Sequence, residues 1–455
     1  MKVVREKAKL SMFALRPGWG RVGNPPTADY LYMNRYSAGV NYLGQVSMNP
    51  SGLKLTDLRW ENIFSYNLGI DLYFFDDRLK FVVDLYRRTT KDMLMNNAGI
   101  PTSNGWSGLA FANVGDMRND GWEVQVMGDR LLKKGKFYAD VYINFANNRN
   151  VITRMDPLVL KALNIDWAEG NRSVVQRVQI DNPFGSIYGF RYKGVYQYQY
   201  DTARELARND ARNNTTVLQD NIDKGITYPV AVNSDGNVVL DADGDPVQMR
   251  FAYKTESKSG YKFKGGDAIY EDVNHDGNIN QLDIVYLGNS LPKLTGGFGF
   301  TLHYDRWALR ANFNYRVDYD ILNMARLDME SMISNNNQSQ AVNYRWRKEG
   351  DVTSIPRAMF GNGSNYNTLI SDRFVEDGSF LRLNYLQLNY SFDPKLLKKW
   401  HMKQLSLYAS ANNLFCITKY SGVDPEIGYG GYGVSTDNSK TPRSKSYTVG
   451  LTIGF

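Results

Sequence analysis

Apolar and polar residues alternate along much of the chain, in segments of strand length. Every second position is apolar from Tyr66 to Phe74, and after the turn at 76–78 the alternation resumes from Leu79 to Leu85. Successive side chains of a β-strand point to opposite faces, so this pattern predicts a tight hairpin with one apolar face. The pattern recurs at 122–145, 298–315 and 381–411, and a last segment covers 447–455.

The length of these segments points to a membrane. Each has roughly the 9–11 residues that a tilted strand needs to cross the hydrocarbon layer. No stretch approaches the ~20 apolar residues of a transmembrane helix, so a chain that crosses a bilayer must do so as a closed barrel. The pattern predicts an all-β fold, a transmembrane antiparallel β-barrel in a Gram-negative-type cell outer membrane.

The links between the segments alternate between short and long. Short links are expected at 75–78, 131–136, 304–307 and 393–402, and long links at about 20–60, 92–115, 149–293, 318–378 and 416–443. Outer-membrane barrels have short periplasmic turns and long extracellular loops, so the long links are predicted to be extracellular. The link 149–293 must contain zero or two crossings, with 183–195 and 247–253 as the candidate pair. We therefore expect ten to twelve strands, with a β-bulge at Tyr385-Leu386.

The polar residues between the apolar ones are expected to face the barrel lumen. Either they line a water-filled transport path, or they form a satisfied hydrogen-bond network in a barrel of no special selectivity. The set comprises Asp71, Asp84, Gln125, Asn144, His303, Arg310 and Asn312.

Composition and charge narrow the functional classes. The 31 Tyr, 21 Phe and 40 Gly among 455 residues favour strands over helices. The net charge of +7 is spread without a basic stripe, so we expect no nucleic-acid partner. None of the three histidines has a recognisable nucleophile setting, so we do not expect an enzyme.

One segment matches the spacing of a calcium-binding loop. Oxygen donors occur at positions 1, 3, 5 and 12 of the run, and a glycine stands at position 6, where the loop turns sharply. The predicted ligands are Asp272, Asn274, Asp276, Asn278 (through its backbone carbonyl) and Asp283. Asp at position 12 has a shorter arm than the usual Glu, so affinity for Ca²⁺ should be reduced. The alternative is an array of Asx-turns that folds without metal. The similar segments 233–237 and 241–245 lack this spacing and are expected to be hairpin turns.

Aromatic residues suggest two further sites. The tyrosines Tyr196, Tyr198, Tyr200, Tyr429 and Tyr432 could stack on sugar rings, although loop packing explains such residues equally well. The terminal strand presents Tyr447, Val449, Leu451, Ile453 and Phe455 on one face. It is similar to the signal by which the barrel-assembly machinery recognises its clients, and it could also be only the last lipid-facing strand.

Several blocks resemble the SusC/RagA family of TonB-linked outer-membrane proteins. They span nearly the whole chain, and their order and spacing are more specific than any single block. The blocks are Leu15–Asn24, Ala112–Val126, Pro183–Gln197, Gly266–Phe298, Arg373–Tyr390 and Tyr408–Ile427, followed by the terminal strand.

The resemblance implies a large plugged barrel that imports oligosaccharides or peptides. A SusD-like surface lipoprotein would close over its mouth, and the TonB system would supply energy through the plug. The 455 residues contain no segment that resembles the family's signal, TonB-contact segment or plug domain, so we expect this chain to correspond to the C-terminal part of a larger barrel. Two alternatives stay open: a self-contained passive porin-like barrel, and a soluble glycan-binding β protein.

Overall fold

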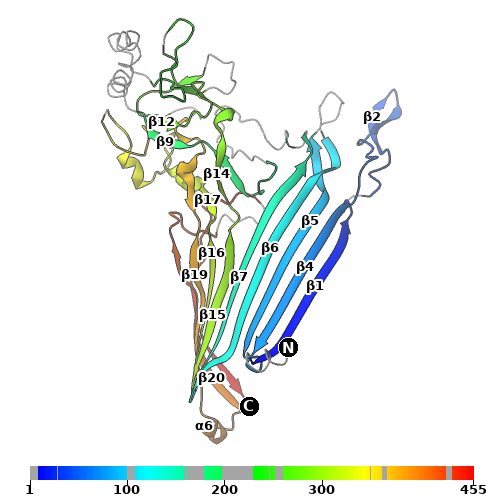
Figure 1. The fold of residues 1–455 in the computed structure, drawn as a ribbon, viewed down its shortest axis with the longest axis vertical. Helices are drawn as coiled ribbons and strands as arrows, with labels where there is room; N and C mark the ends of the chain where they lie inside the picture. The colour runs from blue at the N-terminus through cyan, green and yellow to red at the C-terminus, as the bar shows by residue number, and fades with distance from the viewer. Residues whose placement is uncertain are drawn as a thin grey trace.

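The computed structural model describes residues 9–27, 29–99, 108–157, 160, 179–196, 229–244, 246–251, 260–348, 350–360, 366–426 and 433–455. Its main element is a ten-stranded antiparallel sheet in which sequence neighbours pair in space (Figure 1). In sheet order the strands are β1 (Leu10–Asn24), β4 (Glu61–Phe74), β5 (Leu79–Gly99), β6 (Gly108–Lys134), β7 (Phe137–Met155), β15 (Leu294–Tyr304), β16 (Trp307–Val317), β19 (Phe380–Ser391), β20 (Gln404–Thr418) and β22 (Ser446–Gly454). The predicted all-β antiparallel fold is confirmed.

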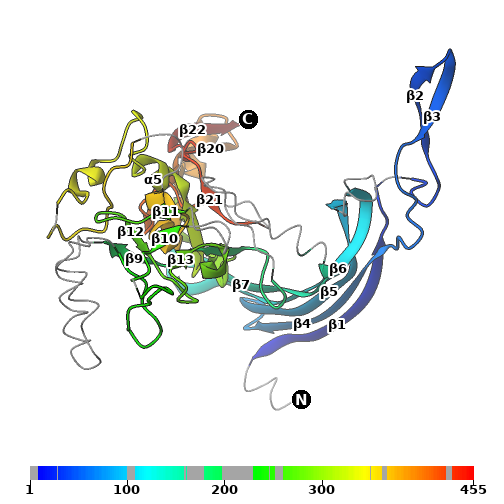
Figure 2. The same cartoon turned by 90° about the horizontal axis from the view of Figure 1, so that it is seen from above.

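The sheet curves into an open arc. Viewed from above, β1 and β22 lie far apart, and they are the two edge strands in the sheet order (Figure 2). An antiparallel sheet that twists and curls in this way has the shape of part of a barrel wall. The prediction of a partial barrel is therefore confirmed.

Strand register places apolar side chains opposite one another across the sheet. One row runs through eight strands: Phe13, Leu72, Phe81, Val126, Ile143, Phe298, Phe313 and Leu383. This face is not sealed inside the protein, because Leu68, Val141 and Leu451 keep 39%, 39% and 56% of their surface exposed. An exposed apolar face of this extent is what a lipid-facing wall requires.

The four short links lie at one end of the sheet. They fall between Phe74 and Leu79, Lys134 and Phe137, Tyr304 and Trp307, and Ser391 and Gln404, the last containing the short helix α6 (Pro394–Lys399). Two of these turns are hydrogen-bonded to a neighbouring strand, from Asp129 N in β6 to Arg78 O (2.7 Å) and from Ser391 N in β19 to Arg306 O (3.0 Å). The chain also ends at this side of the molecule (Figure 1).

Two details differ from the sequence pattern. The described parts of the two candidate crossings, 183–195 and 247–251, form only short strands outside the main sheet, which has ten strands among the described residues. The bulge falls at Asn384, since the register shifts between Leu383 and Tyr385 against both neighbouring strands. The alternation of apolar and polar residues shows a bulge only where two apolar residues come in succession. The sequence therefore indicated Tyr385-Leu386 instead of Asn384.

β5 and β6 continue through most of the link 92–115, beyond the length needed to cross a bilayer. A separate hairpin, β2 (Tyr36–Tyr42) and β3 (Gln45–Pro50), projects away from the sheet in both views (Figures 1 and 2). No helix among the described residues has the length and apolarity to cross a membrane.

The described residues of the long links 156–293, 318–379 and 419–445 together form what we call the extracellular assembly, after the side on which the link lengths predict it to lie. It lies at the end of the sheet opposite the short links (Figure 1). Its strands are β8 (Ser186–Gly189), β9 (Tyr192–Val195), β10 (Arg250–Phe251), β11 (Tyr261–Lys262), β12 (Ala268–Tyr270), β13 (Asn278–Ile279), β14 (Val285–Asn289), β17 (Asp320–Asn323), β18 (Val375–Asp377) and β21 (Thr436–Asp437). Its helical turns are η2 (Gln281–Asp283), α5 (Met324–Met329), η3 (Gln340–Tyr344), η4 (Tyr366–Thr368) and η5 (Asp372–Phe374).

The most extensive apolar core lies in this assembly. It gathers side chains that are far apart in sequence, including Tyr188, Phe251, Phe263, Ile279 and Tyr366. Within it, bridges between Val232 and Val238 and between Leu240 and Pro246 confirm the hairpin turns expected at 233–237 and 241–245. The assembly is thus a packed body on the barrel wall and not a set of independent loops.

Candidate functional site

The predicted lumen residues share one face of the sheet. The register links Asp84 to Gly69, Gln125 to Asn144, and Asn312 to Gly299, so the polar positions follow one another from strand to strand. His303 stacks on Tyr138 at 4.1 Å between ring centroids and lies 3.3 Å from Asp140 Oδ2. The polar face predicted from the sequence is confirmed.

An arginine that the sequence pattern missed organises part of this face. Arg16 in β1 donates from Nε and Nη2 to the two oxygens of Asp71 (2.8 and 2.9 Å). The same guanidinium lies 3.4 Å from Asp84 Oδ2 on β5. One cation therefore links three neighbouring strands and contacts two carboxylates on the polar face. Its position, one strand before the first clear hairpin, is why alternation alone did not select it.

Two adjoining cavities open on the polar face. One of about 420 Å³ lies between the sheet and the extracellular assembly, where Tyr86, Asn148 and Asn150 face Phe184 and Leu291. A second of about 360 Å³ continues along the wall and is lined by side chains that include Asp84, Gln125 and Asn144, and Glu123 borders both cavities. Amide, carboxylate and phenol groups offer donors and acceptors to a hydrophilic ligand.

The predicted calcium loop is a tight turn at the edge of the extracellular core. Asp272 accepts N–H groups from Asp276 (3.2 Å) and Gly277 (2.8 Å), and Asp283 accepts from Val273 and Asn280 (both 2.8 Å). Gly277 has φ +77°, as a sharp turn at this position requires. The loop is flanked by the strands β12 and β14, whereas the loop of an EF-hand is flanked by helices.

The carboxylates of the loop differ in burial and in their hydrogen-bond partners. Asp283 is fully buried, and burial raises its pKa to about 6. Asp276 accepts from the Asn278 backbone at 2.7 Å and from the Asn274 amide at 3.0 Å. Among the described residues no group of three or more His, Cys, Asp or Glu side chains converges as metal ligands do. The loop is hydrogen-bonded as an Asx-turn array, and calcium binding by it stays a prediction.

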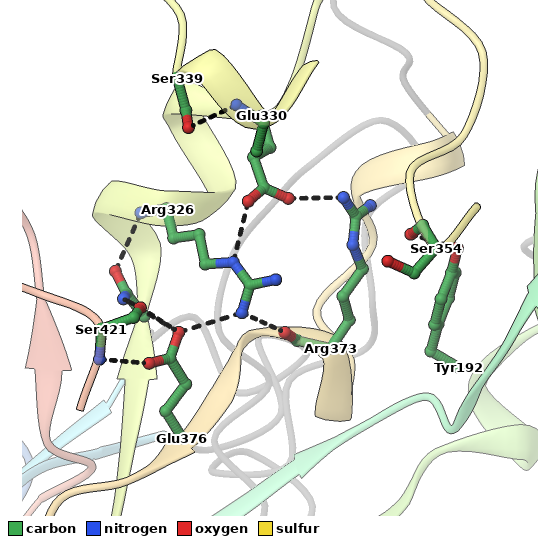
Figure 3. A network of polar contacts seen from close by, with 10 residues as sticks. Tyr192, Arg326, Glu330, Ser339, Ser354, Arg373, Glu376 and Ser421 are labelled. Carbon is green, nitrogen blue, oxygen red and sulfur yellow. Dashed lines mark hydrogen bonds and ion pairs between the residues drawn. The ribbon is translucent and has the colours of Figure 1, made fainter. Parts of the chain in front are cut away.

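A buried ionic network holds the extracellular assembly together (Figure 3). Arg326 on α5 lies between Glu330 Oε1 (2.9 Å) and Glu376 Oε1 (3.1 Å), and Arg373 Nη2 lies 2.5 Å from Glu330 Oε2. Glu376 also accepts from the backbone and hydroxyl of Ser421 (2.9 and 2.8 Å). The network joins segments from the two long links on either side of β19 and β20.

The electrostatics of the network favour the charged states. Burial acts to raise the pKa of Glu376, but the hydrogen bonds from Ser421 and Arg326 outweigh it and hold the pKa below its usual range. Arg373 and Glu330 are each only 5% exposed at the side chain. Removing one partner would leave an uncompensated buried charge.

Three further ion pairs lie within the assembly or join it to the wall. Arg382 on β19 lies 2.6 Å from Asp424 and 2.8 Å from Glu426, which follow β20. Arg357 donates to the fully buried Asp267 at 2.7 Å. The sequence analysis missed these residues. Among the described ion pairs of the assembly, only Arg326 and Glu330 gave a local signal, because they are four residues apart. The other partners are distant in sequence.

Tyr196 is the only predicted sugar-stacking tyrosine within the described residues. It packs on Phe263 with 5.8 Å between ring centroids and borders the extracellular core. Burial raises the pKa of its phenol. This contact agrees with the packing role left open for Tyr196. Tyr198, Tyr200, Tyr429 and Tyr432 lie outside the described residues, and sugar stacking stays a prediction.

The predicted assembly-signal residues follow the edge strand β22. Tyr447, Val449, Leu451 and Ile453 alternate along it, and Phe455 is 77% exposed at the chain end beside the short links. This position is compatible with both roles considered above, and recognition by assembly machinery stays a prediction.

Comparisons with known proteins agree with this geometry. The family model for "TonB dependent receptor-like, beta-barrel" matches residues 11–414. TonB-dependent receptor P39 of Formosa agariphila is 29% identical, over 98% of this chain and 40% of the relative. TonB-dependent receptor SusC of Bacteroides thetaiotaomicron is 26% identical, over 98% of this chain and 38% of the relative. The chain thus spans about 40% of the length of these curated relatives.

Solved structures show the same fold. The RagAB peptide importer in its closed-closed state matches 98% of this chain and 41% of its own, with a TM-score of 0.65 and 23% identity. A second RagAB peptide transporter structure gives a TM-score of 0.66 over 99% of this chain. Because the family model covers most of the chain, the chain belongs to the TonB-dependent receptor-like β-barrel family of outer-membrane proteins.

Proposed function

We propose that this chain forms part of the barrel wall of a SusC-like importer that carries a hydrophilic oligomer, an oligosaccharide or a peptide, across the outer membrane. The observation that carries the proposal is the wall itself, with an exposed apolar face on one side and two polar cavities on the other. A wall of this kind separates lipid from a hydrated path.

The substrate class is argued from the cavity lining. Tyr86, Asn119, Asn148, Asn150 and Glu123 present phenol, amide and carboxylate groups beside the extracellular assembly. Such groups pair with the hydroxyls of a sugar or the amides of a peptide. The cavity lining suits both substrate classes, so both should be tested in the same experiment.

We further propose a SusD-like surface lipoprotein as partner and the TonB system as energy source. The relative from Bacteroides thetaiotaomicron is named SusC, and the matching solved structures are of RagAB, a two-component peptide importer by its title. The packed extracellular assembly offers an ordered surface on which such a lipoprotein could close.

Uptake by cells with and without the gene tests the proposal. The gene would be deleted and restored, and accumulation of labelled oligosaccharides and oligopeptides measured with and without a protonophore. The importer proposal predicts uptake that needs both the gene and the proton gradient. Gene-dependent uptake that survives the protonophore would instead support the passive porin-like alternative.

A lumen variant links the uptake to the described cavities. Glu123→Gln removes one charge that borders both cavities and leaves the outward face unchanged. We expect altered uptake with normal amounts of assembled protein. If the Glu123→Gln variant took up the substrate as fast as the wild type, the transport path would lie elsewhere. Membership of an outer-membrane family already argues against the soluble glycan-binding alternative.

A further inference from the structure

The outward face of the wall carries a groove of about 790 Å³ across β4, β5, β6 and β7. Its floor is apolar on β4, β5 and β6, where Leu68, Leu85 and Trp122 lie opposite one another, and the row ends on β7 with Asn147. The three apolar residues belong to the apolar face that meets lipid. The groove is therefore on the face of the wall that meets lipid and not on the face that lines the lumen.

The rim of the groove is charged. The next row of the same face, two residues nearer the extracellular end, consists of Tyr66, Arg87, Asp120 and Arg149. Side chains two residues apart on a strand share a face and lie roughly 6–7 Å apart. An apolar floor thus changes to a polar rim within one step along the strands.

The position of the rim matches the outer boundary of the hydrocarbon layer. Arg87 follows Leu79, the first residue of β5 after the short turn, by eight positions. A tilted strand crosses the layer in about 9–11 residues, and aromatic residues gather at its boundaries. Tyr66 and Trp122, both exposed, mark this level. The rim therefore lies where the headgroups of the outer leaflet begin.

The charge at the rim is unbalanced toward positive. Arg87 lies 2.6 Å from Asp120, and Arg118, one row higher, lies 2.9 Å from the other oxygen of the same carboxylate. The Arg149 residue is exposed, and its side chain takes part in no ion pair or hydrogen bond with the described residues. One carboxylate faces three guanidinium groups, which leaves Arg149 available for an anion.

We propose that this groove binds an outer-leaflet lipid whose headgroup carries a phosphate. Its acyl chains lie along Leu68, Leu85 and Trp122, and its phosphate accepts hydrogen bonds from Arg149, which lies across Asp120 from Arg87. Guanidinium groups pair with phosphate oxygens in two-point geometry, and the apolar floor selects a lipid over a soluble phosphate.

Native mass spectrometry of the intact receptor, purified from the outer membrane in detergent and stripped of lipid, tests the proposal. Dioleoyl phosphatidic acid is the probe, dioleoylglycerol supplies the same chains without phosphate, and glycerol 3-phosphate supplies phosphate without chains. The test variant is Arg149→Gln. The matched control is Arg88→Gln, an exposed arginine of β5 whose side chain points to the opposite face.

We expect phosphatidic acid to bind the wild type and Arg88→Gln equally. Binding to Arg149→Gln should fall about fivefold, since a cation near an anionic headgroup contributes about 1 kcal/mol. Equal binding to Arg149→Gln would overturn the proposal. If dioleoylglycerol bound as tightly as phosphatidic acid, the groove would make apolar contact only, and the proposal would fail. If glycerol 3-phosphate displaced the lipid, the site would be one for soluble phosphate, and the proposal would also fail.

Discussion

Single charged side chains decide how the extracellular assembly is held together. The network of Arg326, Glu330, Arg373 and Glu376 joins segments that are tens of residues apart, and its members are buried or half-buried. Buried ion pairs add little net stability over apolar packing, but losing one partner is costly. The network should therefore matter most when one of its members is removed.

Glu330→Ala is expected to destabilise the extracellular assembly by about 3–5 kcal/mol, because Arg326 and Arg373 would both lose a buried carboxylate. Native-state proteolysis of the protein in membranes measures this local free energy of unfolding. Lys293→Ala is the control, because its pair with Asp318 is exposed and screened by solvent and should contribute little to stability. Equal protease resistance of Glu330→Ala and the wild type would show that the network does not hold the assembly.

Two alternative predictions apply to the loop 272–283, a calcium site and an Asx-turn array, and a calcium titration distinguishes them. As a calcium site it should bind Ca²⁺ in a titration of the intact protein, with affinity lowered by Asp at position 12 and lost in Asp276→Ala. As an Asx-turn array it should show no heat of binding at millimolar Ca²⁺. The hydrogen bonds from Gly277 to Asp272 and from Asn280 to Asp283 form under either description.

At the scale of elements, the strands were the easiest features to predict. A strand between lipid and a polar lumen tends to alternate from residue to residue, so Ile143 and Asn144, or Val83 and Asp84, report their faces directly. The short elements of the extracellular assembly were not predicted. Their core joins Tyr188, Phe251 and Tyr366 through contacts that no local pattern encodes.

A charge on the lipid face of a strand should block assembly, whereas the same charge on the lumen face should be tolerated. Ile143→Arg places the guanidinium in hydrocarbon at a cost of about 2–4 kcal/mol near the bilayer midplane. Asn144→Arg, one residue further along β7, points to the polar cavity. The heat-modifiable, folded fraction in isolated outer membranes compares the two. A larger loss for Asn144→Arg would invert our assignment of the faces.

The end of β22 offers a second prediction about one element. Deleting Phe455, which lies exposed beyond the last strand, is expected to reduce the amount of assembled barrel, and Phe455→Tyr should retain it because the aromatic ring remains. The amount of folded protein in the outer membrane measures the effect. Normal assembly of the deletion would remove the signalling role and leave β22 as a lipid-facing strand alone.

At the scale of the whole molecule, the sequence predicted the barrel wall and not the body above it. Alternation, link lengths and the resemblance identified the fold, the faces and the family, because the membrane imposes one rule on every crossing. The Arg16 bridge to Asp71 and Asp84, the cavities beside Phe184, and the outward groove depend on register between strands. Register becomes visible only when the strands are placed side by side.

Our account depends most on the outward apolar face of this wall. Cys416, the only cysteine, would be replaced by serine, and single cysteines placed in turn at positions 141 to 144 of β7 in native outer membranes. We expect a membrane-impermeant maleimide to label positions 142 and 144 through the hydrated lumen, and bilayer-embedded quenchers to reach a fluorophore at 141 and 143. Labelling without a two-residue period, or with the opposite period, would contradict the account.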